Sequence, residues 1–487
     1  MDRPNILIFM SDQQRGDSIP PYSVAKTPHL DKFCKEGITF SKAFTISPHC
    51  CPARATFFSG LYPSQHGVWN NVNVGNTLSR GLYEGVRLWS EDFRDAGYDM
   101  YYSGKWHVSD TESPKERGFD KYNNPWTEVT SKEYKHEKPS PYEWARYNDL
   151  QPEKERQEAE IYKRGYPLYT HYGEKENPFK DNDVVNDALR IFKERKQTGK
   201  PWCQYVGTLG PHDPYFVPAK FLDLYDPKDI ILPASYSDKM TDKPAMYRRI
   251  RDKFDQLPEN EQREAIRHYL AFCSYEDDLF GQVLNALEES GEADNTLVLY
   301  TSDHGDYMAD HGLWCKGLPC FEGAYHIPAA VRWPGKIKNP GEVTDSFVTL
   351  ADFAPTFLEA AGIKTNREFI GRSLTPFFNG EKPADWEDVL YTQSNGNEQY
   401  GIQRSVRTRD WKLVYNGFDY DELYDLRADP GETVNLIPGG RVDPKYKEQV
   451  HELFKMLWKF AKKTDDVCIN AYVMVSLATE GPGVIFE

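Results

Sequence analysis

The stretch NILIFM, Asn5–Met10, decides the fold class of this chain. Its five consecutive apolar residues do not alternate with polar ones, which is typical of a central strand in a parallel sheet that helices cover on both faces. The next residues, SDQQ (Ser11–Gln14), are polar. Ligands of open α/β sheets bind beyond the carboxyl ends of the strands, so Asp12 is a candidate metal ligand or catalytic carboxylate. The alternative is an aspartate that only caps a turn.

Four further segments repeat this arrangement of a strand followed by reactive side chains. The predicted strands are Ile38–Phe44, Asp99–Ser103, Trp202–Thr208 and Thr296–Thr301. In the same order, these strands are followed by Cys50 with Arg54, by Lys105 with His107, by His212, and by Asp303 with His304. Lys316 lies in the loop after Asp303 and His304. Helices are predicted from Pro28 to about Glu36 and at Leu88–Ala96, Asp181–Gln197, Glu259–Ser290 and Ser346–Gly362. Strands that alternate with helices indicate an α/β fold.

The pattern changes beyond about Asp385. Short strands are predicted at Ser405–Thr408, Trp411–Tyr415 and Asp421–Asp425, followed by a helix at Lys445–Ala461. This indicates a small antiparallel sheet with one helix, an α+β subdomain. We therefore expect a catalytic α/β domain at residues 1–384 and a C-terminal subdomain at 385–487, as the length of 487 residues suggests. Residues 110–179 form a polar, tyrosine-rich insertion that we expect to act as a lid, with a solvated flap as the alternative.

Composition excludes several kinds of partner. The chain has 59 Lys and Arg against 75 Asp and Glu, a formal charge of −16, and it has no basic stripe for nucleic acid. No apolar run approaches the roughly 20 residues that cross a bilayer. The start, MDRPNILIFM, lacks the layout of a signal peptide, so we expect a cytoplasmic protein or a trimmed form of an exported one. The eight cysteines are too sparse for a disulfide scaffold, although Cys315 and Cys320 could pair.

The segment SPHCCPARATFFSG, Ser47–Gly60, brings three informative residues together as C-x-P-x-R: Cys50, Pro52 and Arg54. Pro52 suits the first turn of a helix. Cys50 is then expected just ahead of a helix N-terminus, where backbone N–H groups favour negative charge, and Arg54 about one turn along on the same side. Such a site can hold an anion and attack it. The alternative is a buried cysteine beside a helix-capping proline.

Two other pairs of residues suit the chemistry of an oxyanion. In an extended segment Lys105 and His107 point to one face, where they can bind an oxyanion and move a proton. Asp303 and His304 offer an oxygen and a nitrogen ligand at a strand end. Each pair alone can be incidental, but their common position after strands of one sheet is improbable by chance.

The Ser47–Gly60 segment resembles the signature of the type I sulfatases, a family of the alkaline-phosphatase-like superfamily. GKWH (Gly104–His107) resembles the second family signature, PHDPY (Pro211–Tyr215) resembles its third conserved site, and SDHGD with the later KG (Ser302–Gly317) resembles its metal and substrate element. The resemblance spans roughly the whole chain, including the C-terminal subdomain. It implies a large mixed, mostly parallel sheet and an enzyme that hydrolyses a sulfate monoester of a carbohydrate or a similar small alcohol.

The resemblance also implies a nucleophile and a metal. In the family the first cysteine of C-x-P-x-R is oxidised to formylglycine by a maturation enzyme, so Cys50 would become both the nucleophile and a metal ligand. One divalent ion is implied, Ca²⁺ by family expectation, with Mg²⁺ and Mn²⁺ not excluded. Its other ligands would be Asp12, Asp303 and His304. Gln13 stands where most members carry a second aspartate, and its amide oxygen can still offer an uncharged ligand.

The remaining roles follow from the same resemblance. Arg54, Lys105 and Lys316 would neutralise the charge that grows in the transition state. Lys105, His212 and Lys316 would contact the substrate. His212 would protonate the leaving alcohol, and His107 would deprotonate the second hydroxyl of the hydrated formylglycine.

Two other functions fit the same residues. The Asp12–Gln13 pair also occurs in phosphonate monoester hydrolases, so a phosphodiesterase or phosphonate monoester hydrolase on this scaffold is one alternative. Those enzymes typically lack the Lys105/His107 element, which favours sulfate. A sugar-binding protein with an unmodified Cys50 is the alternative outside enzymes.

Overall fold

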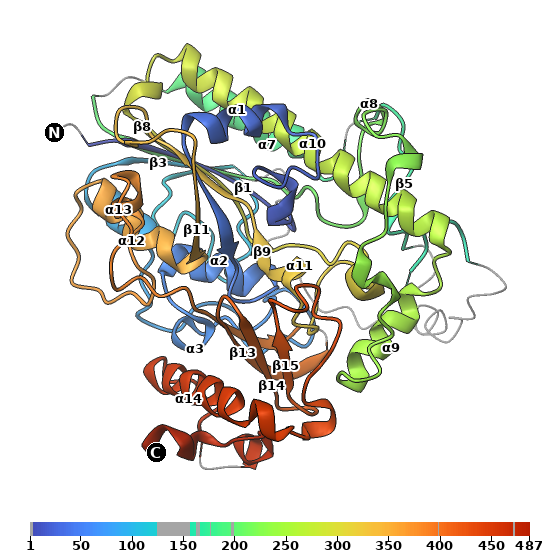
Figure 1. Ribbon diagram of the computed structural model, residues 1–487. Helices are drawn as coiled ribbons and strands as arrows, with labels where there is room; N and C mark the ends of the chain where they lie inside the picture. The colour runs from blue at the N-terminus through green and yellow to red at the C-terminus, as the bar shows by residue number, and fades with distance from the viewer. Residues whose placement is uncertain are drawn as a thin grey trace.

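The computed structural model describes residues 3–123, 156–161, 166–175, 177–195, 199–397, 399–470 and 473–487. A large sheet runs through the molecule with helices on both faces, and a smaller sheet lies below it (Figure 1). The strand order of the large sheet is β11-β2-β10-β8-β1-β6-β3-β4, and β9 pairs with β2. Only β9 and β10 pair with their neighbours in antiparallel fashion. The predicted large mixed, mostly parallel sheet is confirmed.

The strands of this sheet follow the chain closely where the sequence is apolar. They are β1 (Asn5–Ser11), β2 (Ile38–Phe44), β3 (Asp99–Gly104), β4 (Lys121–Asn123), β6 (Trp202–Gly207), β8 (Thr296–Ser302), β9 (His326–Ile327), β10 (Ala329–Arg332) and β11 (Glu342–Thr349). Every residue of β1 is buried. Leu7 and Phe9 pack into the core on one face, and Ile8 and Met10 pack into the core on the other. Burial on both faces is what the unbroken apolar run predicts.

Helices cover both faces of the sheet (Figure 1). One face packs against α1 (Pro28–Glu36), α7 (Asp181–Glu194) and α10 (Glu259–Glu289). The other face packs against α2 (Cys50–Ser59), α4 (Trp89–Asp95), α12 (Phe353–Ala360) and α13 (Thr375–Phe378).

The central parallel strands end at the same edge of the sheet. Met10 of β1 and Gly104 of β3 both pair with Gly207 of β6, and Ser11 of β1 pairs with Ser302 of β8. The loops that follow these four strands therefore start side by side. This edge is where ligands of such sheets are expected to bind.

The C-terminal part forms its own antiparallel sheet. Its strands, in order, are β12 (Leu390–Gly396), β13 (Tyr400–Arg407), β14 (Trp411–Asn416) and β15 (Glu422–Asp425), and α14 (Lys447–Lys463) packs on one face. The ring centroids of Tyr415 on β14 and Trp458 on α14 lie 5.2 Å apart. The predicted α+β subdomain is confirmed, and its boundary at residues 384 and 385 stays a prediction.

Two predictions about local structure were wrong, and one strand was not predicted. The helix predicted at Ser346–Gly362 begins only at Phe353, because Phe347 and Val348 continue β11 and pair with β2. The strand β12 was not predicted, since its sequence, LYTQSNG, has no apolar run. Cys50 does not precede α2 but is its first residue, with His49 as the N-cap.

Several predictions concern features that the structure describes only in part. Most of the insertion at 110–179, including residues 124–155, lies outside the described residues, and its role as a lid stays a prediction. Among the described residues no helix is both long and apolar enough to cross a membrane. All eight cysteines are described, buried and free, so Cys315 and Cys320 do not pair.

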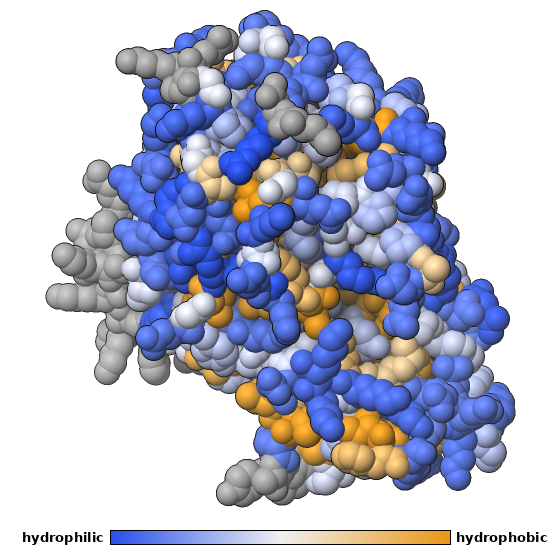
Figure 2. All heavy atoms as spheres, turned by 90° about the vertical axis from the view of Figure 1, so that its left-hand side faces the viewer, coloured by the Kyte–Doolittle hydropathy of each residue, from blue (hydrophilic) through white to orange (hydrophobic). Residues whose placement is uncertain are grey.

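Polar side chains cover most of the face that Figure 2 presents. An apolar area lies in its lower part, at the height where Figure 1 places α14 and the C-terminal residues. Leu477 and Phe486 in this part of the chain are exposed, the latter to 81%.

Candidate active site

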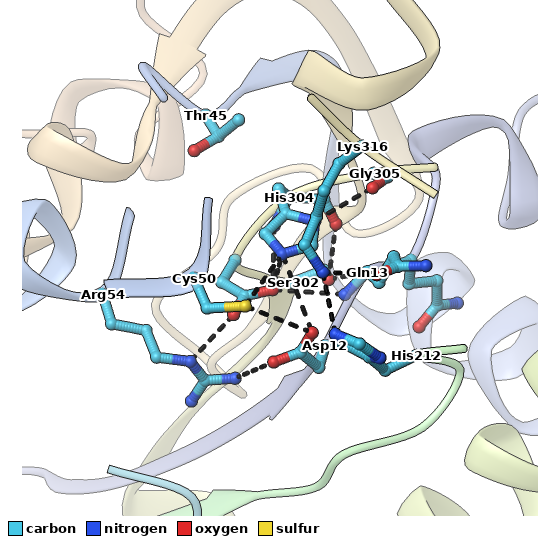
Figure 3. A network of polar contacts seen from close by, with 12 residues as sticks. Asp12, Gln13, Thr45, Cys50, Arg54, His212, Ser302, His304, Gly305 and Lys316 are labelled. Carbon is cyan, nitrogen blue, oxygen red and sulfur yellow. Dashed lines mark hydrogen bonds and ion pairs between the residues drawn. The ribbon is translucent and has the colours of Figure 1, made fainter. Parts of the chain in front are cut away.

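Four side chains from three separate segments meet at the carboxyl edge of the sheet. Asp12 follows β1, Cys50 opens α2, and Asp303 and His304 follow β8 (Figure 3). One potential ligand atom from each residue lies within 4.8 Å of those of the other three. Cys50 Sγ is 3.3 Å from His304 Nε2 and 3.8 Å from Asp12 Oδ1. All four residues are buried, with at most 1% of their surface exposed.

Local hydrogen bonds orient His304 and Asp303 in this cluster. Nδ1 of His304 donates to the carbonyl oxygen of Gly305 at 2.9 Å, which leaves Nε2 with a lone pair that faces the cluster. Nε2 is 3.7 Å from both Asp12 Oδ1 and Asp303 Oδ1. Oδ1 of Asp303 accepts hydrogen bonds from the backbone N–H groups of Gln13 and His304.

Arg54 donates hydrogen bonds to the carboxylates of both Asp12 and Asp303. Its Nε donates to Asp303 Oδ2 at 2.8 Å, and its Nη2 donates to Asp12 Oδ2 at 3.1 Å. The hydroxyl of Tyr205 and the carbonyl oxygen of Lys105 accept from Nη1. None of the Arg54 surface is exposed. A buried guanidinium with two carboxylate partners fixes their spacing, because neither acid can move without losing a charge-assisted hydrogen bond.

The charges around Asp12 decide its protonation. Burial and the neighbouring Cys50 raise the pKa of Asp12, whereas Lys105, His212 and Arg54 lower it and prevail, so the pKa lies well below its usual range. Lys105 forms an ion pair with Asp12 Oδ2. By contrast, burial and the negative charge of Asp12 raise the pKa of Asp303 despite Arg54. Asp12 is therefore held ionised, whereas its surroundings disfavour the ionised form of Asp303.

Cys50 is surrounded by cations. Burial raises the pKa of the Cys50 thiol, but Lys105, Lys316 and His304 hold it well below its ordinary value. His107 also lies against Cys50. Its Nε2 donates a hydrogen bond at 2.8 Å to Oδ1 of Asn73, a residue that sequence reasoning missed. Burial and Lys105 lower the pKa of His107, which favours a neutral imidazole.

His212 and Lys316 form a second pair beside Cys50. Nζ of Lys316 donates to Nε2 of His212 at 2.8 Å, and Nδ1 of His212 donates to the carbonyl oxygen of Asp213. The Asp213 carboxylate is 3.4 Å from Nδ1. Burial and Lys316 lower the pKa of His212, whereas Asp213, Cys50 and Asp12 raise it and prevail. Since Nε2 of His212 accepts from Lys316, the proton between these two nitrogens belongs to the pair, which is suited to deliver it to an oxygen nearby.

Gln13 links this pair to the rest of the site. Its Oε1 accepts a hydrogen bond from Lys316 at 2.6 Å, and its Nε2 donates to Asp213 Oδ1 and to Asp306 Oδ2. The amide oxygen is thus engaged by Lys316, so it would have to give up this hydrogen bond to bind an ion. Metal ligation by Gln13 stays a prediction.

The structure brings together every residue that the sequence singled out, and it adds three that the sequence did not. His107 contacts Asn73, and Arg54 contacts Tyr205. His212 contacts Asp213. Asp213 adjoins His212 within PHDPY, so its position was a usable signal. Asn73 lies in a loop after α3 (Pro63–His66), and Tyr205 lies inside β6, where nothing local distinguishes them.

The donor set fits a hard divalent cation. Two carboxylates and an imidazole whose Nε2 is directed at them converge on one point, and oxygen-rich sets of this kind suit Ca²⁺ or Mg²⁺. Burial and the neighbouring Asp12 raise the pKa of Asp303, and a cation bound beside it would favour its ionised form. The ammonium groups of Lys105 and Lys316 lie beside this cluster, near Cys50, and their positive charge suits an anionic substrate.

Comparison with known proteins agrees with this geometry. Residues 4–363 match the family model described as Sulfatase, and residues 309–463 match the model described as N-sulphoglucosamine sulphohydrolase, C-terminal. The chain is 31% identical over 460 residues to the choline-sulfatase of Rhizobium meliloti (strain 1021), which covers 91% of this chain and 84% of that relative.

Two solved structures share the fold. The phosphonate monoester hydrolase of Agrobacterium radiobacter has a TM-score of 0.76 at 22% identity, and covers 95% of this chain and 96% of its own. A structure described as a complex with its substrate D-glucosamine-2-N,6-O-disulfate has a TM-score of 0.73 at 22% identity, with 96% and 99% covered. At these identities the likeness concerns the fold alone.

Replacing Arg54 by alanine should destabilise the metal-free protein strongly. The change leaves the Asp303 carboxylate buried without its cation and removes one of two cations from Asp12. Loss of one partner from a buried ion pair costs about 3–5 kcal/mol of the free energy of unfolding. Urea denaturation in the presence of EDTA measures this difference.

Arg332→Ala is the matched control. Arg332 also bridges two acids, Glu36 and Glu288, but their side chains are 40% and 54% exposed. Because those acids remain hydrated, the expected loss is roughly 1 kcal/mol. Equal losses in the two variants would contradict the claim that Arg54 compensates buried charge.

Proposed function

Because the chain belongs to the sulfatase family and is a sulfuric ester hydrolase, we propose that it cleaves the sulfate monoester of a carbohydrate or a similar small alcohol at the Cys50 site. The observation that carries this proposal is the cluster of Asp12, Cys50, Asp303 and His304, whose ligand atoms lie within 4.8 Å of one another. The choline-sulfatase relative and the fold neighbour that holds a disulfated glucosamine support both kinds of alcohol as substrates.

The proposed cofactor is one divalent ion held by Asp12, Asp303, His304 and residue 50. When bound, a hard dication of this kind, for which we propose Ca²⁺, polarises the S–O bonds and stabilises charge on oxygen. Arg54 keeps Asp12 and Asp303 at the spacing that the ion needs. Since Lys105 also pairs with Asp12, this ligand remains ionised in a buried site.

The proposed nucleophile is formylglycine, made from Cys50 by a maturation enzyme. Hydrated, this residue supplies one hydroxyl that attacks sulfur and a second whose deprotonation releases sulfate. His107 is proposed to take that proton. It lies against Cys50, and burial and Lys105 lower its pKa, which keeps the imidazole neutral and able to accept a proton. Asn73 holds the other side of the His107 ring.

Lys105 and Lys316 are proposed to bind the sulfate oxygens. Both ammonium groups act on Cys50, and their positive charge offsets the negative charge that develops during transfer. His212 is proposed to protonate the leaving oxygen, with Lys316 as its hydrogen-bonding partner. The Asp213 carboxylate raises the pKa of His212 and so helps it to carry the proton.

A comparison of substrates tests the proposed reaction. The matured protein with Ca²⁺ should hydrolyse 4-nitrophenyl sulfate with a higher kcat/KM than 4-nitrophenyl phenylphosphonate, because the Lys105/His107 pair is present. The two substrates share a leaving group, so the ratio reports the transferred group. A clear preference for the phosphonate would replace our proposal with the phosphonate monoester hydrolase alternative.

Conversion of Cys50 is predicted to be visible by mass and necessary for turnover. Oxidation of the thiol to the aldehyde lowers the mass of the peptide that contains residue 50 by about 18 Da. Cys50→Ala should lack both this shift and turnover of 4-nitrophenyl sulfate. Cys51→Ala is the matched control, since Cys51 lies beside Cys50 in α2 but faces the core, and it should retain both. Turnover by the Cys50→Ala variant would refute the assignment of the nucleophile.

The effect of the His212→Ala substitution on activity should depend on the leaving group of the substrate. An alcohol must be protonated as it departs, whereas 4-nitrophenolate is a stable anion, so His212→Ala should reduce kcat/KM by about 10²–10⁴-fold for a sulfated alcohol and far less for 4-nitrophenyl sulfate. The aryl substrate serves as the internal control for folding and metal binding. A loss of the same size on both substrates would show that His212 is not the proton donor.

A further inference from the structure

A second cluster of potential metal ligands lies away from the Cys50 site. It consists of His171, which follows β5 (Tyr169–Thr170), and of Glu264 and His268, which are one turn apart on α10. A ring nitrogen of each histidine and a carboxylate oxygen of Glu264 all lie within 4.8 Å of one another. Figure 1 shows β5 beside the N-terminal half of α10, so the cluster joins two segments that are far apart in sequence.

His268 is the buried member of this cluster. None of its surface is exposed. Its Nδ1 donates to the backbone carbonyl oxygen of Glu264 at 2.9 Å and lies 3.3 Å from the Glu264 carboxylate. Within the described part of the chain its Nε2, also buried, has no hydrogen-bond partner. A buried ring nitrogen without a partner is costly unless something binds it.

His171 leaves the cluster open to solvent. Its side chain is 57% exposed, and its ring centroid lies 5.1 Å from that of His268. Glu158 contacts His171 Nε2 at 3.3 Å and accepts a hydrogen bond from the hydroxyl of Tyr169. A carboxylate that contacts a histidine in this way is the usual outer partner of an imidazole that binds a metal.

We propose that His171, Glu264 and His268 form a second metal site, of the kind that binds Zn²⁺. Two imidazoles and one carboxylate are the protein ligands of many zinc sites, and a water molecule can complete the tetrahedron from the solvent side. This donor set is softer than the two carboxylates and single imidazole of the Cys50 site, which suit Ca²⁺. The two sites therefore select different ions.

The position of the site indicates what the ion does. It connects α10 to the segment that contains β5, and this segment also carries Tyr166, whose hydroxyl donates to Asp213 Oδ2 at 2.6 Å. Asp213 adjoins His212. A bound ion would fasten this segment to the rigid helix and so hold Tyr166 against the loop that carries His212.

Zn²⁺ titration of the full-length protein tests the proposal. The protein, without an affinity tag and saturated with Ca²⁺, is titrated with Zn²⁺ by isothermal calorimetry, and Co²⁺ absorption reports the geometry. We expect one equivalent of Zn²⁺ to bind and the Co²⁺ spectrum to show a tetrahedral site. His171→Ala and Glu264→Gln should each weaken binding by at least roughly tenfold, because each removes a direct ligand.

His451→Ala is the matched control. His451, on α14, also pairs with a glutamate, Glu480, at 2.8 Å, but among the residues that the structure describes it belongs to no group of three potential metal ligands. The variant should bind Zn²⁺ like the wild type. His171 is exposed and Glu264→Gln keeps the side-chain shape, so both variants should fold, which circular dichroism checks. The proposal would be overturned if the wild type did not bind Zn²⁺, or if both variants bound it as tightly as the wild type does. These readouts do not depend on turnover, so they stand apart from the proposed sulfatase reaction.

Discussion

The site depends on the neutralisation of two buried carboxylates. Asp12 and Asp303 lie side by side with no exposed surface, an arrangement that repulsion and the loss of hydration would disrupt if no cation were near. Arg54 donates to both, and Lys105 adds a second charge at Asp12. These cations do not bring the pKa of Asp303 down to its ordinary value, and a divalent ion among the four side chains would favour the ionised carboxylate.

The sheet makes this arrangement possible. β1 lies between β6 and β8 and all three run in parallel, so residues that are hundreds of positions apart leave the sheet at one edge. α2 contributes Cys50 from its first turn and Arg54 from one turn further, so that the Cys50 thiol contacts Asp12 and the Arg54 guanidinium binds Asp303. Moving any of these strands by one residue would turn its catalytic side chain away from the edge.

Much of this could be predicted from the sequence because the signals are local. The apolar run before Asp12 predicts a buried strand, and the polar residues after each strand predict the edge at which they meet. The contacts of Asn73 and Tyr205 could not be predicted, since each depends on which distant loop or strand packs beside it. The start of α12 was misplaced because Phe347 and Val348 suit a strand or a helix equally well, and only pairing with β2 decides between them. The contacts of Gln13 could not be predicted either. Its amide oxygen could have faced the cluster with Asp12 and Asp303, but it accepts a hydrogen bond from Lys316.

The most direct test of the account is to locate the ion. Crystals of the matured protein grown with Mn²⁺, which scatters anomalously and can replace a hard dication at oxygen ligands, would show it in an anomalous difference map. We predict one strong peak bounded by Asp12, residue 50, Asp303 and His304, with Arg54 still joining the two acids. A peak elsewhere, with these four side chains unchanged and nothing among them, would contradict the central claim that this buried cluster holds the proposed ion.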